Sequence, residues 1–352
     1  MGQTLELTFQ NLNARMLIMF TLVLFTLIYG AKEIFSKTSL VNLGIFVIYM
    51  LLVLFEIYFH GTNTASHLLY ELFFPIMFFS SFLVLNNAKP KTLIRVIPLQ
   101  YIFCVVFFLV FIYGIIFMSR IQGIYKNTCF YLCCFLPFVL ASSKNWMKIS
   151  GIILCVLPSI IVSKRTPLLA IIAACVFYLL ISLKDHKHKW RMIISSLFVI
   201  GVVYYLSLNL QTDIVDRIRT MDEDGGSGRL DIFSAVWQGI SNSSWVQWLF
   251  GHGVYQEYAT DNDFSAHNDF LEIFWDYGFV GFLVYVFMIF SLFRNRVFIK
   301  KYKPELYCPY LASIVQFLVC SFSTNMLFAP SYIALFAIFW GYSYAGIKYR
   351  NR

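Results

Sequence analysis

The chain has 352 residues, of which 59% are hydrophobic and only 13% charged, and its formal net charge is +9. Soluble domains average about 45–50% apolar and about 25% charged residues. This composition therefore excludes a soluble enzyme, a disordered chain, a secreted disulfide scaffold and a nucleic-acid-binding domain.

Membrane-spanning helices are the main predicted elements, because a span needs about 20 largely apolar residues and such runs recur along the chain. In chain order, the eleven predicted spans are 16–31, 40–59, 67–85, 96–118, 127–142, 149–163, 166–183, 191–208, 270–293, 307–322 and 330–346. Several runs are short, so we expect ten to twelve spans. The predicted fold class is an all-α polytopic membrane protein, with residues 1–352 forming a single transmembrane domain.

One connection is long, residues 209–269, and long loops in compact proteins are usually functional. Most of the 27 Lys and Arg residues lie in an alternating set of connections, including the basic segments 184–191 and 294–303 on either side of this loop. Cytoplasmic loops carry such an excess of Lys and Arg. We therefore place the C-terminus inside the cell and the loop outside the cytoplasm, and we expect the loop to form part of the active site.

The long loop has predicted structure of its own. Residues 222–230 indicate a Gly-rich turn that leads into a helix. Apolar residues then recur at three- and four-residue spacing, namely Leu230, Phe233, Trp237 and Ile240. This amphipathic stripe suits a short helix that lies on the bilayer surface, with tryptophan at the level of the headgroups.

Lys164 and Arg165 lie in a short outer connection, where the positive-inside tendency would not place them. Thr166 is the expected N-cap of the next span and Pro167 its expected first helical residue. Free N–H groups and the dipole at such a helix start favour an anion. The pair is therefore a candidate phosphate site, and the alternative is a snorkelling pair that anchors the hairpin.

Two further candidates lie in the loop. Arg229 follows Gly228 at the start of the loop helix, and its planar guanidinium suits bidentate phosphate contacts; the alternative is a surface arginine. His267 precedes Asn268 and Asp269, either of which could cap the next span. A histidine is the natural general base near neutral pH, and the alternative is a loop histidine at the headgroup level.

A metal site has little support in the sequence. The acidic segment 261–263 offers two carboxylates, whereas hard cations need several more oxygen ligands. His252 and His267 lack a third ligand at helix-fixed spacing. We expect no metal and no cofactor.

The motifs around the loop form an ordered set. Its members are Arg165 before a span, Gly228-Arg229 opening a helix with Trp237, Leu249-Phe250-Gly251-His252-Gly253, His267-Asn268-Asp269-Phe270-Leu271 and Tyr277-Gly278-Phe279-Val280-Gly281. In this order the set resembles the O-antigen polymerases and O-antigen ligases of bacterial surface-polysaccharide assembly. The resemblance covers roughly residues 150–295.

The resemblance implies metal-independent, inverting glycosyl transfer at the periplasmic face of the bacterial inner membrane. The donor would be an undecaprenyl-diphosphate-linked glycan and the acceptor a sugar hydroxyl. The implied site residues are the base His267, the diphosphate-binding Arg165, Arg229 and Lys164, and the supporting Asn268, Gly228 and His252.

The implied partners are lipid-linked glycans, membrane lipids and a polysaccharide chain-length regulator, with no nucleic acid. A short, alanine-poor chain favours a polymerase, which joins repeat units, over a ligase, which transfers the glycan to lipid A–core. A flippase for lipid-linked oligosaccharides is the alternative from another functional class.

Overall fold

A computed structural model describes residues 51, 90–117, 122–182, 225–253, 266–324, 326 and 330–345. Every regular element in these ranges is a helix, and no strand occurs among them, which confirms the all-α prediction for this part of the chain. The helices belong to two compact units. The first contains Ser227–Asn295 and Ser321–Arg352, and the second contains Pro90–Gly226 and Arg296–Cys320.

Several helices are long and apolar enough to cross a membrane. In the described residues they are Leu93–Ile116, Arg165–Ser182, Asp269–Tyr302 and Pro304–Ser323, and the shorter apolar helices are Asn127–Leu140, Asn145–Ile161 and Tyr332–Tyr344. The four long helices coincide with predicted spans. The total of about eleven spans stays a prediction, because spans 16–31, 40–59, 67–85 and 191–208 lie outside the described residues.

The second unit is built from α5 (Pro90–Phe117), α6 (Gln122–Cys134), α7 (Leu136–Leu140), α8 (Asn145–Ile161), α9 (Arg165–Ser182) and most of α15 (Pro304–Ser323). The predicted span 127–142 is two helices here, with a break at Phe135. Pro137 explains the break, because proline has no N–H to donate to the carbonyl four residues earlier, that of Cys133. Gln316 of α15 supplies the missing donor, from Nε2 to the Cys133 carbonyl at 2.7 Å.

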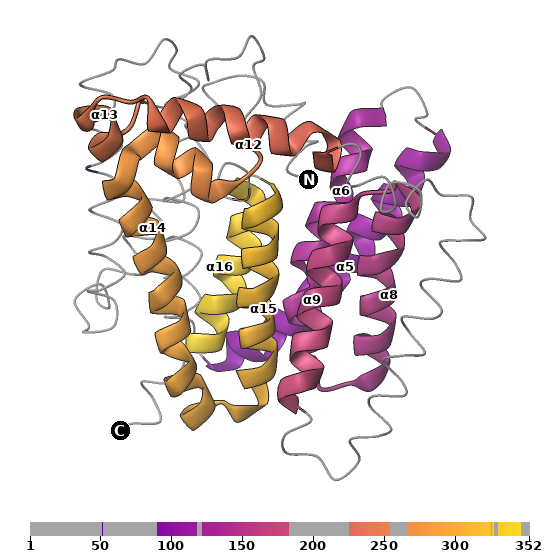
Figure 1. The fold of residues 1–352 in the computed structure, drawn as a ribbon. Coiled ribbons are helices and arrows are strands. Elements are labelled where there is room, and N and C mark those ends of the chain that lie inside the picture. The colour runs from indigo at the N-terminus through magenta and orange to yellow at the C-terminus, as the bar shows by residue number, and fades with distance from the viewer. Residues whose placement is uncertain are drawn as a thin grey trace, which may run out of the picture. The chain divides into compact units, whose positions relative to one another are not determined.

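The first unit contains α12 (Gly225–Ser241), α13 (Trp245–Phe250), the greater part of α14 (Asp269–Tyr302) and α16 (Pro330–Tyr344). Figure 1 shows α12 lying crosswise over the N-terminal end of α14. Val236 and Ile240 on one face of α12 pack with Trp275 of α14 in a buried cluster that Ile232 borders. Burial of this face orients α12 on α14.

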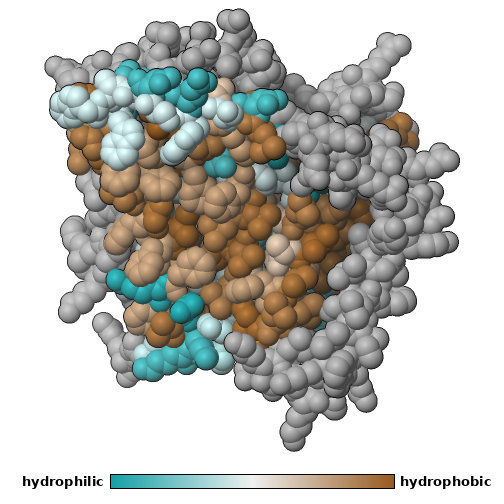
Figure 2. Space-filling view, in the orientation of Figure 1, coloured by the Kyte–Doolittle hydropathy of each residue, from teal (hydrophilic) through white to brown (hydrophobic). Residues whose placement is uncertain are grey.

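The structure corrects the predicted apolar stripe of α12. The buried face runs through Ile232, Val236 and Ile240 at four-residue spacing, whereas Leu230 and Trp237 are 61% and 59% exposed. The helix carries apolar residues on two faces, and only the face that meets Trp275 is covered. Figure 2 shows apolar side chains along α14 below a paler, more hydrophilic band at α12 and α13.

Three predicted boundaries also differ from the structure. The Gly-rich segment is the first turn of α12, which begins at Gly225 rather than after a turn; tertiary packing of a buried face outweighs the low helix propensity of glycine. Helix α9 begins at Arg165, so Thr166 is not its N-cap and Pro167 is not its first residue. The basic segment 294–303 is not an open connection, because α14 continues as a helix through Tyr302.

Candidate active site

Two predicted site residues meet at the C-terminal end of α15. Arg229 on α12 donates from Nη1 to the carbonyl oxygen of Ser323, and Asn268 donates from Nδ2 to that of Phe322 at 3.3 Å. The last carbonyls of a helix lack intrahelical partners and carry the negative end of the helix dipole. A cation and an amide are therefore well placed there. The motifs that contain Arg229 and Asn268 lie far apart in the sequence, and they meet here because their side chains bond to adjacent carbonyls.

His267 lies directly before the N-cap of α14. Asn268 is that cap, since its Oδ1 accepts hydrogen bonds from the backbone N–H groups of Phe270 at 2.9 Å and Leu271 at 3.2 Å. His267 itself is half-buried and has φ of 49°, a left-handed conformation that is uncommon outside glycine. Asp269, the first residue of the helix, is fully buried, where the helix dipole favours a carboxylate.

Helix α14 is broken at Gly278, which has φ of 64° and ψ of −164°. In an unbroken helix, the carbonyls of Trp275 and Asp276 would accept from N–H groups four residues later. Here they accept from the backbone N–H groups of His252 at 2.8 Å and Gly253 at 3.2 Å. The segment after α13 therefore satisfies carbonyls at the break. We call this contact between residues 251–253 and 275–278 the glycine junction.

The glycines in the junction allow two backbones to touch. A Cβ on Gly251 would lie 2.0 Å from the carbonyl oxygen of Asp276, and one on Gly278 would lie 2.4 Å from the carbonyl carbon of Leu249. Both residues have positive φ, a region that only glycine adopts readily. The motifs 249–253 and 277–281 are thus two halves of one contact.

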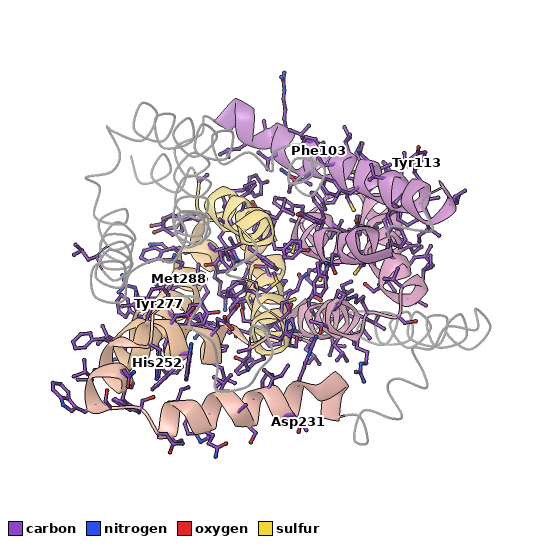
Figure 3. The ribbon with its side chains drawn as sticks, turned by 90° about the horizontal axis from the view of Figure 1, so that it is seen from above. Phe103, Tyr113, Asp231, His252, Tyr277 and Met288 are labelled. Atoms are coloured by element: carbon purple, nitrogen blue, oxygen red, sulfur yellow. The ribbon has the colours of Figure 1, made fainter. Side chains whose placement is uncertain are left out.

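His252 has a structural place in this junction. Its ring stacks on Trp275, with centroids 3.8 Å apart and planes 6° apart, and its Nε2 lies 2.9 Å from the hydroxyl of Ser243. Figure 3 shows His252 beside Tyr277, where the loop meets α14. Stacking and hydrogen bonding hold the imidazole in the packing of α12, α13 and α14. The role in glycosyl transfer predicted for His252 stays a prediction.

Lys164 and Arg165 belong to the second unit, whereas Arg229 and His267 belong to the first. Ser163 has φ of 52°, and the Lys164 backbone N–H donates to the carbonyl of Ser159 at 3.0 Å as α8 ends. Both cationic side chains are half-buried. The predicted cooperation of Arg165 with Arg229 stays a prediction.

Among the described residues, no group of three or more His, Cys, Asp or Glu side chains could hold a metal ion. The acidic segment 261–263 lies outside those residues. The described site therefore consists of cations, a histidine, amides and carboxylates, which can bind an anion and move a proton.

The family comparison matches the same part of the chain. Residues 150–286 match the family model described as O-antigen ligase. Over these residues the chain is similar to the O-antigen ligase family. The match runs from α8 to the first half of α14 and includes Arg165, Arg229, His252 and His267. It confirms the predicted ligase and polymerase family and supports glycosyl transfer in a membrane; no curated protein matches the chain.

The sequence gives no sign of the contact that Glu272 makes in the matched segment. Glu272 accepts a hydrogen bond at Oε2 from the backbone N–H of Ala266 at 2.6 Å. A glutamate three residues after an N-cap is the known capping-box signal. Glu272 lies four residues after Asn268 and reaches past the cap, so the usual spacing does not identify it.

Proposed function

We propose that this chain transfers a glycan from undecaprenyl diphosphate to a sugar hydroxyl at the periplasmic face of the bacterial inner membrane. The observation that carries the proposal is the meeting of Arg229 and Asn268, the neighbour of His267, at the end of α15. The segment that carries the candidate base and the candidate phosphate-binding cation are thereby both held at the C-terminal end of α15.

The proposed chemistry needs no group beyond the chain's own residues and the two substrates. His267 takes the proton from the acceptor hydroxyl, whose oxygen forms a bond to the anomeric carbon of the donor. The bond from that carbon to the diphosphate breaks, and undecaprenyl diphosphate leaves with the electron pair. Attack opposite the leaving group inverts the anomeric configuration.

Arg229 balances the negative charge that grows on the leaving diphosphate, as fixed cations do in other transferases. A guanidinium carries five N–H donors, so its bond to Ser323 is compatible with a bidentate contact to phosphate. We assign the same role to Arg165, assisted by Lys164, from their place beside the start of α9. General-base catalysis by a residue such as His267 contributes about 10²–10⁴-fold.

Polymerase activity is the form of this function that we favour, with repeat units as acceptors. Ligase activity, with lipid A–core as the acceptor, is the second candidate, because the matching family model is described as O-antigen ligase. The two share donor, site residues and chemistry and differ only in the acceptor.

A deletion strain examined for its lipopolysaccharide tests the proposal. Core carrying a single repeat unit identifies a polymerase, and bare core with accumulated lipid-linked polymer identifies a ligase. Bare core with repeat units trapped in the cytoplasmic leaflet would identify a flippase and overturn the proposal. His267→Ala should not restore full-length polysaccharide in the deletion strain, although the variant is present in the membrane at the wild-type level. Full-length polysaccharide from that variant would remove the base assignment.

A further inference from the structure

Glu272 is bonded to the turn that carries His267. Its Oε2 accepts from the backbone N–H of Ala266 at 2.6 Å, and Ala266 is fully buried directly before His267. Glu272 lies in the first turn of α14 and is half-buried. The carboxylate therefore bonds backward across the start of the helix to the segment that enters it.

Hydrogen bonds bracket His267 on both sides. Ala266 before it is bonded to Glu272, and Asn268 after it caps α14 and donates to the carbonyl of Phe322. The residue between them has φ of 49°. A non-glycine residue in the left-handed region persists where its surroundings over-determine it. The Glu272 bond, together with the packing of Ala266 in the buried cluster with Val236, Ile240 and Trp275, holds the segment on the N-terminal side.

The chemistry of the Glu272 bond also indicates a functional role for this carboxylate. Acidic residues in membrane spans are rare and commonly functional. A hydrogen bond from a backbone N–H to a carboxylate is charge-assisted, hence shorter and stronger than one to a neutral acceptor. Glu272 makes this bond with the backbone next to the candidate base.

We propose that Glu272 is a positioning residue for glycosyl transfer, which fixes the Ala266 backbone and thereby the direction of the His267 imidazole. The inference rests on the proposed function, in which His267 takes the proton from the acceptor. In this assignment Glu272 touches no reacting atom. Displacement of a reacting group by about 1 Å can lower a rate by about 10²-fold, so loss of this bond reduces turnover more than substrate binding.

Variants of the full-length protein in lipid nanodiscs test the inference, with lipid-linked glycan extracted from the deletion strain as the donor. Glu272→Ala should lower kcat by about 10- to 100-fold, with KM for the donor changed by less than about threefold. Glu272→Gln should keep kcat within about fivefold, because an amide oxygen can still accept from Ala266. Glu305→Ala is the matched control, since Glu305 is an exposed acid in the first turn of α15, and it should leave kcat unchanged.

A double variant separates positioning from a general loss of structure. In a His267→Ala background, Glu272→Ala should change the residual rate by less than about twofold, because a residue that acts through His267 has lost its target. Equal losses in both backgrounds, or a Glu272→Gln variant as defective as Glu272→Ala, would overturn the inference. Full activity of Glu272→Ala beside an inactive His267→Ala overturns the inference alone, whereas full activity of His267→Ala removes the base assignment in the proposed function.

Discussion

Gly251→Ala tests the glycine junction directly. Gly251 has φ of 93°, and an added Cβ would lie 2.0 Å from the carbonyl oxygen of Asp276 and 2.6 Å from the backbone nitrogen of Tyr277. Both neighbours are backbone atoms, so neither can rotate away as a flexible side chain could. We therefore expect the segment after α13 to separate from the break in α14.

The cost of this separation follows from the contacts that it removes. Gly251 has φ of 93° and ψ of 180°, a region that essentially only glycine adopts, where an alanine costs about 1–3 kcal/mol. The bonds from His252 to Trp275 and from Gly253 to Asp276 are also lost, each with a net contribution of about 0.5–1.5 kcal/mol. The junction should lose about 2–6 kcal/mol of local stability, which corresponds to roughly 30-fold to 20,000-fold in its opening equilibrium.

Hydrogen–deuterium exchange of the purified protein measures this opening at the amides of His252 and Gly253. Gly251→Ala should raise their exchange rates by that factor and lower the melting temperature. Val246→Ala is the control, because Val246 lies on α13 and is 44% exposed, and surface substitutions usually change stability by less than about 0.5 kcal/mol. Unchanged exchange at both amides in Gly251→Ala would refute the backbone-contact reasoning.

Substitutions at three further positions test the other contacts. Asn268→Asp keeps the cap of α14 but loses the donor to Phe322, so it should lower glycosyl-transfer activity by about tenfold. Asn268→Ala also loses the cap, which costs about 1 kcal/mol and lowers the melting temperature. Identical behaviour of the two variants would contradict separate roles for the cap and for the bond to Phe322. Arg229→Lys should keep the charge but lose the planar guanidinium, and we expect less than about a tenth of the wild-type amount of polysaccharide on a lipopolysaccharide gel. Polysaccharide of wild-type amount and length from this variant would contradict the assigned role. Gln316→Leu leaves the buried carbonyl of Cys133 without its donor, which should cost about 1–3 kcal/mol and lower the melting temperature; a melting temperature equal to that of wild type would show that the carbonyl needs no donor.

Helix type and approximate span positions could be predicted from local sequence. The run 270–293 lies inside α14, and the run 96–118 nearly coincides with α5. The length of an apolar run is a local property, so no knowledge of packing partners is needed to recognise it. Breaks are harder to place, although the proline in 127–142 offered a signal for the interruption between α6 and α7.

The face that α12 buries could not be predicted in the same way. Leu230 and Trp237 fit a helical stripe as well as Ile232 and Val236 do, because periodicity identifies an apolar face without naming what covers it. The choice depends on Trp275, which lies on another helix, α14, and packs on the second face. A helix with two apolar faces is therefore ambiguous until its partner is known.

The sequence by itself determined the all-helical membrane class and the ordered motifs that resemble the O-antigen ligases and polymerases, since both depend on residue type and spacing along the chain. Only the tertiary structure decided that Arg229 and Asn268 meet at the end of α15 and that the segment after Gly251 bonds at the break beside Gly278. All four of these hydrogen bonds end on backbone carbonyl oxygens. A backbone atom is the same at every position, so it leaves no mark in the sequence to show which distant side chain or loop will reach it.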